Sequence, residues 1–169
     1  DYIVDKLCET ARDPRAHRYS ASRGIKGLRK AHVAYYKRRF GVDLNPDKEV
    51  IAALGSKEGF ANLAMAITAP GDVVLVPNPA YPIHAFGFIM SGGAIRHLPV
   101  SVDDKFLSAV DRALRHSVPK PIALVLNFPS NPTAQCVGLE FYERVIRIAR
   151  EHSIWVIQDL AYADLVFDG

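Results

Sequence analysis

The chain has 169 residues, of which 49% are hydrophobic and 23% are charged, and its net charge is +3. This is a one-domain length with an ordinary globular composition, which excludes disordered, collagen-like and low-complexity classes. The longest uncharged run, residues 73–95, contains three prolines and is not predicted to be a membrane-spanning helix. Cys8 and Cys136 are the only cysteines, too few for a disulfide scaffold or a structural zinc site.

The charge is unevenly distributed along the chain. Residues 1–40 carry 11 Lys and Arg against 4 Asp and Glu, whereas residues 41–169 carry 10 against 14. No basic run exceeds three residues and no nucleic-acid-binding motif accompanies it, so we expect a solvated helix and a site for small anions rather than a nucleic-acid partner. The charged start DYIVDKLCET does not resemble a signal peptide, and we expect a cytoplasmic protein without a membrane partner.

Five short runs rich in Val, Ile, Leu and Ala are predicted to be buried strands. They are Val50–Leu54, Val73–Val76, Ala94–Leu98, Ile122–Leu126 and Ile154–Gln158. Apolar residues repeat with helical spacing in the segments 25–35, 60–67, 106–114 and 142–149. Strands that alternate with helices predict an α/β fold with three α/β/α layers and a mostly parallel sheet. The chain begins within an expected helix and ends soon after a strand, as a piece of a larger protein would.

Ligands of doubly wound sheets bind beyond the carboxyl ends of the strands, so the residues that follow each strand are the candidates for a site. Gly55-Ser56-Lys57-Glu58-Gly59 follows the first expected strand and opens a helix, whose free N–H groups can bind an anion. The alternative is a plain helix cap by Ser56, with Glu58 favoured by the helix dipole. No GxxxxGK[ST] motif is present, which argues against a nucleoside-triphosphate loop.

Two loops that contain prolines follow later strands. Tyr81 lies in the loop 77–82, where its ring can lie against a planar ligand or simply pack at a corner. The loop 127–133 offers side-chain amides, which can donate to a ligand oxygen or close an Asx-turn.

Asp159 directly follows the last expected strand, and Tyr162 lies three residues further on. A carboxylate at the end of a buried strand is costly to desolvate unless it meets a cation or a strong donor. Capping a helix is the alternative role. The six histidines have no metal-ligand spacing, and GxSxG, HExxH and CxxC motifs are absent, so neither a metal site nor a Ser-His-Asp or zinc hydrolase is predicted.

In combination, these segments resemble the class I/II pyridoxal-phosphate-dependent aminotransferases of fold type I. The segments that carry the resemblance are HRYSASRGIKGLRKA (17–31), GSKEG (55–59), VLVPNPAYPIH (74–84), FPSNPTAQC (128–136) and QDLAYADLVFDG (158–169). Within that family, NPTAQC and DLAYAD are most similar to the bacterial alanine (glutamate–pyruvate) aminotransferase group. One departure is Ala134, at a position where the family often has glycine.

The resemblance implies pyridoxal 5′-phosphate as the cofactor and an amino acid and a 2-oxo acid as substrates, with alanine and 2-oxoglutarate as the expected pair. It implies that Asp159 and Tyr81 act in catalysis. The implied cofactor contacts are Ser56, Lys57 and Glu58 at the phosphate, Tyr81 on the ring, Asn131 and Tyr162 at the ring oxygen, and Asp159 at the ring nitrogen. It also implies a homodimer, in which Tyr19 reaches the phosphate bound by the neighbouring subunit.

The resemblance further implies that residues 1–169 are part of the cofactor-binding large domain, with the rest of that domain and the small domain outside them. The Schiff-base lysine and the arginine for the substrate carboxylate would follow Gly169, so we expect the chain by itself to be inactive. Two more strands would lie between Val50–Leu54 and Ile154–Gln158, which leaves a gap and an aggregation-prone sheet edge.

Three alternatives stay open from the sequence. One is a pyridoxal-phosphate-dependent lyase or synthase of the same fold, and another is a non-catalytic aminotransferase-like domain of a transcription regulator. The third is an unrelated nucleotide-binding α/β domain, against which the lack of GxGxxG after the first expected strand argues.

Overall fold

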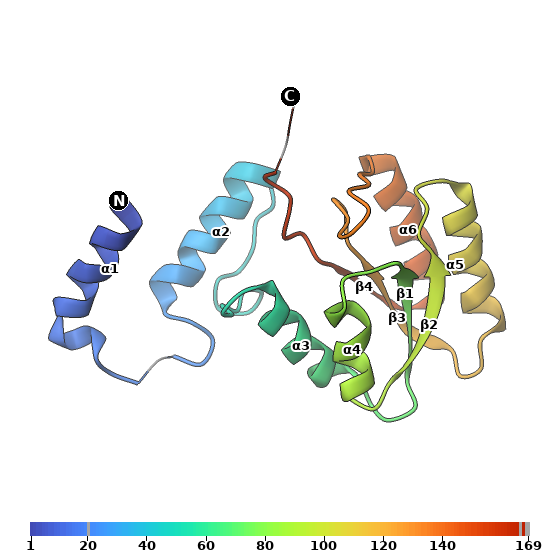
Figure 1. Ribbon diagram of the computed structural model, residues 1–169, viewed down its shortest axis with the longest axis horizontal. Coiled ribbons are helices and arrows are strands. Elements are labelled where there is room, and N and C mark those ends of the chain that lie inside the picture. The colour runs from blue at the N-terminus through green and yellow to red at the C-terminus, as the bar shows by residue number, and fades with distance from the viewer. Residues whose placement is uncertain (20, 166, 168–169) are drawn as a thin grey trace. The chain divides into compact units, whose positions relative to one another are not determined.

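A computed structural model describes residues 1–19, 21–165 and 167 (Figure 1). Its contacts divide the chain into two units, Asp1–Ala53 and Leu54–Gly169. Among the helices of the described residues, none is long and apolar enough to cross a membrane.

The first unit is helical. Its elements are α1 (Tyr2–Arg12), the short 3-10 helix η1 (Pro14–Ala16) and α2 (Lys26–Phe40), which confirms the helix predicted at 25–35 except for Ile25, its N-cap. Helix α2 ends at Phe40 and is capped by Gly41, whose left-handed φ of 70° suits glycine. Among the described residues of this unit, only Arg29 is buried, and it forms an ion pair with Asp47 at 3.0 Å. The described part of this unit therefore has no buried apolar core.

The strand predicted at Val50–Leu54 is wrong, because this segment is irregular. The Ala52 N–H donates to the carbonyl of Arg23 at 3.1 Å, and the Leu54 N–H donates to Oε2 of Glu58 at 2.8 Å. A loop carbonyl and a carboxylate thus satisfy backbone groups that a strand would pair with a neighbouring strand. An apolar run in the sequence does not reveal whether such a neighbour is available.

The second unit alternates helices and strands. Its elements are α3 (Ser56–Ile67), β1 (Val73–Asn78), α4 (Ile83–Met90), β2 (Ala94–Pro99), α5 (Asp104–His116), β3 (Pro121–Leu126), α6 (Leu139–His152) and β4 (Trp155–Gln158). The strands form one sheet in the order β2-β1-β3-β4, and every neighbouring pair is parallel. The other four predicted strands are confirmed with small shifts at their ends.

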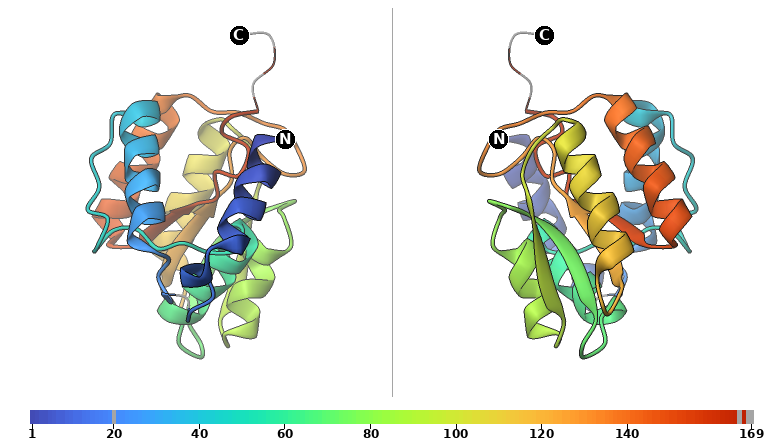
Figure 2. Two further views of the ribbon diagram at one scale, coloured as in Figure 1. Left: turned by 90° about the vertical axis from the view of Figure 1, so that its left-hand side faces the viewer. Right: turned by 90° about the vertical axis from the view of Figure 1, so that its right-hand side faces the viewer.

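Helices cover both faces of this sheet: α3 and α4 lie on one face, and α5 and α6 lie on the other (Figures 1 and 2). Successive side chains of a strand point to opposite faces. Val74 and Val76 of β1 accordingly pack with Phe60 of α3 and Phe88 of α4, whereas Leu75 packs with the side chains of α5 and α6. The predicted three-layer α/β/α arrangement with a mostly parallel sheet is confirmed.

Helix α4 has no counterpart among the predicted elements. Its sequence, IHAFGFIM, carries no Lys, Arg, Asp or Glu, so no charged face marks it as amphipathic. It packs closely on α3: a Cβ on Gly87 would lie 3.4 Å from that of Ala64, and the rings of Phe60 and Phe88 meet edge to face at 5.7 Å. This packing fixes α4 beside the carboxyl end of β1.

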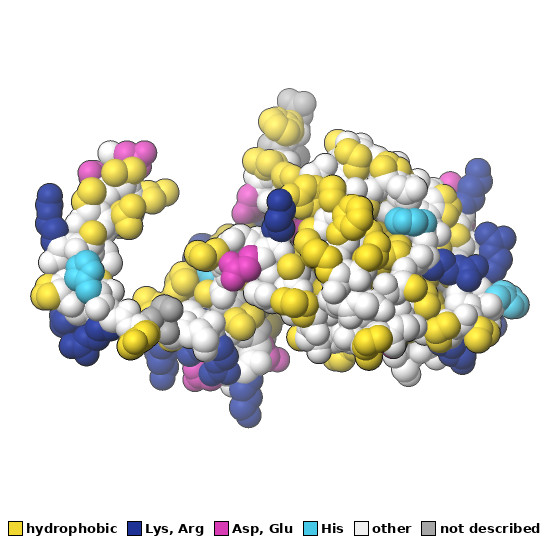
Figure 3. Space-filling model, turned by 60° about the horizontal axis from the view of Figure 1, so that its bottom comes forward, with side chains coloured by type: hydrophobic (Ala, Val, Ile, Leu, Met, Phe, Trp, Pro, Cys, Tyr) yellow, Lys and Arg dark blue, Asp and Glu magenta, His cyan; other side chains and the backbone are white. Residues whose placement is uncertain are grey.

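One edge of the sheet is open. Within the described residues β4 pairs with β3 alone, and a groove of about 360 Å³ beside it is lined by Leu63 and Ile67 of α3 and by β4. Trp155 in this strand is 67% exposed. Further apolar side chains lie on the surface of this unit (yellow in Figure 3). An open apolar edge favours pairing with another strand, so aggregation of the isolated chain stays a prediction.

Candidate functional site

A cavity at the carboxyl ends of the strands collects side chains from separate segments of the second unit. Its volume is about 100 Å³, and it is lined by Ser56, Lys57, Tyr81, Asn127, Asn131, Asp159, Ala161 and Tyr162. These residues come from the start of α3 and from the segments that follow β1, β3 and β4. Typical ligand pockets measure about 300–1,000 Å³, so this cavity by itself is smaller than a typical ligand site.

The start of α3 offers backbone donors to this cavity. Gly55 is the N-cap, with φ 92° and ψ 159°, a conformation that is essentially restricted to glycine. The helix has no side-chain cap, and the first N–H groups of any helix lack intrahelical acceptors. The cap by Ser56 considered above is therefore wrong. Ser56 and Lys57 bring the N-terminal dipole and its free N–H groups to the cavity, where they favour an anion.

Two of the predicted site residues do not line the cavity. The carboxylate of Glu58 accepts from the Leu54 N–H at 2.8 Å and so closes the turn before α3, which leaves Glu58 its backbone N–H as the group that can meet a phosphate. Tyr19 belongs to the first unit and is fully exposed. Its contact with the phosphate of a neighbouring subunit stays a prediction.

Tyr81 is half-buried and held by two neighbours. The Lys57 ammonium lies 5.6 Å from the centre of its ring, a cation–π contact, and the ring of His84 meets it edge to face at 5.9 Å. The loop after β1 thus presents a fixed aromatic ring to the cavity.

Asp159 presents a buried carboxylate, with a side chain that is 8% exposed. Its Oδ2 accepts from Nε2–H of His84 at 2.9 Å, and its Oδ1 accepts from the Ala161 N–H at 3.2 Å. The hydrogen bond from His84 lowers the pKa of the Asp159 carboxyl and outweighs burial, which raises it. Asp159 is therefore ionised at neutral pH and can accept a hydrogen bond from a cationic group.

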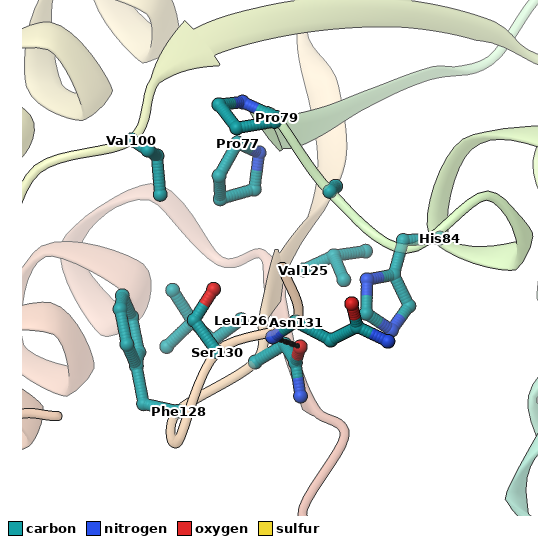
Figure 4. A pocket seen from close by; sticks show the side chains of 11 residues that line it. Pro77, Pro79, His84, Val100, Val125, Leu126, Phe128, Ser130 and Asn131 are labelled. Carbon is teal, nitrogen blue, oxygen red and sulfur yellow. Dashed lines mark hydrogen bonds between the residues drawn. The ribbon is translucent and has the colours of Figure 1, made fainter. Parts of the chain in front are cut away.

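His84 has no role among those predicted from the sequence. This residue is 1% exposed in α4, where it packs on the ring of Phe60 at 5.0 Å. Its partner Asp159 lies 75 positions away, so no motif spacing links the two. The only signal in the sequence is that His84 follows Tyr81 by three residues, in a segment already assigned to the site. Figure 4 shows the His84 ring and the Asn131 side chain pointing toward one another beside a small cavity of about 10 Å³.

Asn131 and Tyr162 form a second polar pair in the cavity of about 100 Å³. Nδ2 of Asn131 donates to the Tyr162 hydroxyl at 3.3 Å. The backbone N–H of Asn131 donates to Oδ1 of Asn127 at 2.8 Å, the dashed line in Figure 4. The amide and the phenol are both donors, so the pair can stabilise a negatively charged ligand oxygen.

This donor set fits pyridoxal 5′-phosphate, a flat ring that carries a phosphate, a ring nitrogen and a ring oxygen. The helix start suits the phosphate, the Asp159 carboxylate suits a protonated ring nitrogen, and the Asn131–Tyr162 pair suits the ring oxygen.

Comparison with known proteins agrees with this fit. The family model "Aminotransferase class I and II" matches residues 3–169. The chain belongs to this aminotransferase family. Enzymes of the family depend on pyridoxal 5′-phosphate.

Three of the matched proteins illustrate the family. AatC of Rhizobium meliloti is 64% identical over 166 residues, which are 98% of this chain and 41% of that protein. Glutamate-pyruvate aminotransferase AlaC of Escherichia coli is 49% identical over 168 residues, which are 99% of this chain and 41% of AlaC. The structure of alanine aminotransferase from Pyrococcus furiosus matches with a TM-score of 0.85 at 27% identity, over 98% of this chain and 42% of that one. Further relatives, at 34% to 40% identity, are named LL-diaminopimelate aminotransferases.

Proposed function

We propose that the full-length protein transfers the amino group of alanine to 2-oxoglutarate, which yields pyruvate and glutamate. The observation that carries the proposal is the buried, ionised carboxylate of Asp159 in one cavity with the uncapped start of α3. Alanine is supported by the names of AlaC and of the Pyrococcus structure, while the LL-diaminopimelate aminotransferases offer a second candidate donor. The chain spans about 41% of the length of AatC and AlaC, so the activity belongs to the longer protein.

Pyridoxal 5′-phosphate supplies an electron sink for negative charge at the α-carbon of the substrate when it is bound. Asp159 holds a proton on the ring nitrogen, because opposite charges in contact favour both charged forms. The hydrogen bond from His84 favours the ionised form of Asp159, which this task requires.

The remaining residues orient the ring. Asn131 and Tyr162 donate to the ring oxygen and stabilise its negative charge without removing the positive charge of the ring nitrogen. Tyr81 fixes the plane of the ring, and the N–H groups at the start of α3 anchor the phosphate, so that the reacting carbon is held in position.

We further propose that residues 1–169 form part of the large domain of a cytoplasmic homodimer, in which Tyr19 reaches the neighbouring subunit's phosphate site. The 169-residue chain alone is proposed to be inactive, with its catalytic lysine and its substrate-carboxylate arginine outside this segment. These statements rest on the resemblance to the family.

A coupled assay of the full-length protein tests the reaction. We expect equal amounts of pyruvate and glutamate from alanine and 2-oxoglutarate, dependent on added cofactor. Faster turnover of LL-diaminopimelate would reassign the donor, and cleavage of an amino acid without a 2-oxo acid would favour the lyase alternative. The 169-residue chain should show no turnover; turnover together with a borohydride-reducible bond between the cofactor and Lys57 would contradict its proposed inactivity.

A further inference from the structure

Asn127 lies at the junction of the two segments that carry the ring-binding side chains. We propose that it is a positioning residue, which holds Asp159 and Asn131 at the separation that lets both contact one bound pyridine ring. The inference rests on the proposed function, since it presumes that the ring binds in this cavity. Asn127 is 9% exposed and lines the cavity, yet it belongs to none of the ring contacts that the resemblance implies.

Both halves of the Asn127 amide bind backbone groups of residues with proposed roles. Its Nδ2 donates to the Asp159 carbonyl at 2.9 Å, and its Oδ1 accepts from the Asn131 N–H at 2.8 Å. One rigid, planar group therefore bridges the loop after β3 and the segment after β4. Because Asn131 also donates to Tyr162, the bridge reaches a third ring-contacting residue.

The bridge begins where the sheet ends. The β3–β4 pairing stops at Leu126 opposite Gln158, and one more backbone bond, from the Asp159 N–H to the Leu126 carbonyl, follows at 2.9 Å. Beyond that point, Asn127 connects the two segments, together with Gln158, whose Nε2 donates to the carbonyls of Phe128 and Asp159. The hydrogen bonds of Gln158 do not reach Asn131, so among these hydrogen bonds the Asn127 bridge is the one that couples the two ring-binding groups.

The chemistry of the position favours asparagine. The bridge needs one donor and one acceptor on a short planar side chain. Aspartate lacks the donor, glutamine is one methylene longer, and serine is too short to reach both partners. Burial makes the requirement stricter, because a buried donor or acceptor without a partner is costly.

A residue that only links the two loops and stabilises the fold would make the same hydrogen bonds. The test must therefore separate an effect on stability from an effect on ring binding. We would compare the full-length wild type with Asn127→Ala, and with Asn62→Ala at an exposed site of α3 as the matched control. Three quantities are measured: the unfolding midpoint, the Kd for pyridoxal 5′-phosphate, and the ¹⁵N shift of the bound, ring-labelled cofactor.

At temperatures where all variants are folded, we expect Asn127→Ala to bind pyridoxal 5′-phosphate about tenfold more weakly, the effect of losing roughly two hydrogen bonds. Its ring ¹⁵N shift should move toward the unprotonated value, because Asp159 no longer meets the ring nitrogen correctly. Asn62→Ala should match the wild type in both quantities. If Asn127→Ala does not fold, Asn127→Ser, which keeps a polar group but cannot bridge, should show the same two changes.

A lowered unfolding midpoint with unchanged Kd and unchanged ring ¹⁵N shift would overturn the positioning role. It would show that Asn127 only stabilises the fold. Failure of the proposed function looks different: the coupled assay of the wild type would then show no transamination of alanine, and a wild type that did not bind pyridoxal 5′-phosphate would remove the premise that the ring binds here.

Discussion

The cavity has two parts that are built in different ways. The anion subsite, formed by Gly55, Ser56 and Lys57, consists of backbone groups in one turn. The ring subsite consists of side chains from segments far apart in the sequence: Asn127, Asn131, Asp159 and Tyr162 line the cavity, and His84 holds Asp159 from α4. The anion subsite therefore depends on one backbone conformation, whereas the ring subsite depends on the identity and burial of each side chain.

The largest effect is expected from the charge of Asp159. In the full-length protein, Asp159→Asn and Asp159→Ala should each lower kcat by about 10²–10³-fold, the usual cost of removing a group that stabilises charge in the transition state. Both variants should still bind the cofactor, more weakly, because the anion subsite is intact. The measurement is steady-state turnover of alanine with 2-oxoglutarate. A near-normal kcat in Asp159→Asn would show that Asp159 is not the partner of the ring nitrogen.

Gly55→Ala tests the anion subsite by changing its backbone conformation and no charged or polar side chain. The φ of 92° should cost the variant about 1–3 kcal/mol of strain and displace the first turn of α3. We expect a lower unfolding midpoint and weaker binding of pyridoxal 5′-phosphate, measured by thermal unfolding and absorbance titration.

Gly27→Ala in α2 is the matched control for this substitution. A Cβ at Gly27 meets no atom within 4 Å, and alanine there should raise stability by about 0.5–1 kcal/mol without changing cofactor affinity. Equal effects of the two substitutions would show that the backbone at Gly55 has no special role.

His84→Leu tests how the ring subsite keeps its carboxylate ionised. In the wild type the folded pKa of Asp159 lies below the ordinary value of about 3.9, so Asp159 contributes stability above that pH and loses it as pH falls through the folded pKa. Without the His84 donor, burial raises this pKa and only the hydrogen bond from the Ala161 N–H opposes it, so we expect the pKa to rise. Carboxyl ¹³C titration should show the rise, while the lowered pKa of Asp111, which Arg115 causes, should stay where it is. An unchanged Asp159 pKa would mean that His84 does not control it.

Ala134→Gly is expected to have the smallest effect. Ala134 adopts a left-handed φ of 55° in the loop of the ring subsite, where an L side chain is strained. Glycine relieves the strain but loses more chain entropy on folding, so we expect a net gain of about 0.5 kcal/mol in urea unfolding. Cofactor affinity should not change, because Asn127 holds Asn131 in either case. A loss of stability would show that the loop carries no such strain.

The difference between the anion subsite and the ring subsite also explains which of their residues the sequence could predict. Gly55 to Glu58 are consecutive, so a local pattern was enough to indicate an anion site, although not that the Glu58 carboxylate turns back to Leu54. The places of Tyr81, Asn131 and Asp159 followed from the rule that ligands lie beyond the ends of parallel strands.

Other features of the structure could not be predicted from the sequence. The His84–Asp159 and Asn127–Asp159 contacts join residues 75 and 32 positions apart, and only the packing of α4 and the pairing of β3 with β4 create them. The strand predicted at Val50–Leu54 failed for a related reason, because strand formation depends on a pairing partner and not on the apolar run alone.

The most direct test of the account is a crystal structure of the full-length protein with pyridoxal 5′-phosphate. We predict that the ring nitrogen lies about 3 Å from the carboxylate of Asp159 and that the phosphate oxygens accept from the N–H groups of Ser56 and Lys57. A phosphate bound away from the start of α3, or a ring nitrogen without contact to Asp159, would contradict the account.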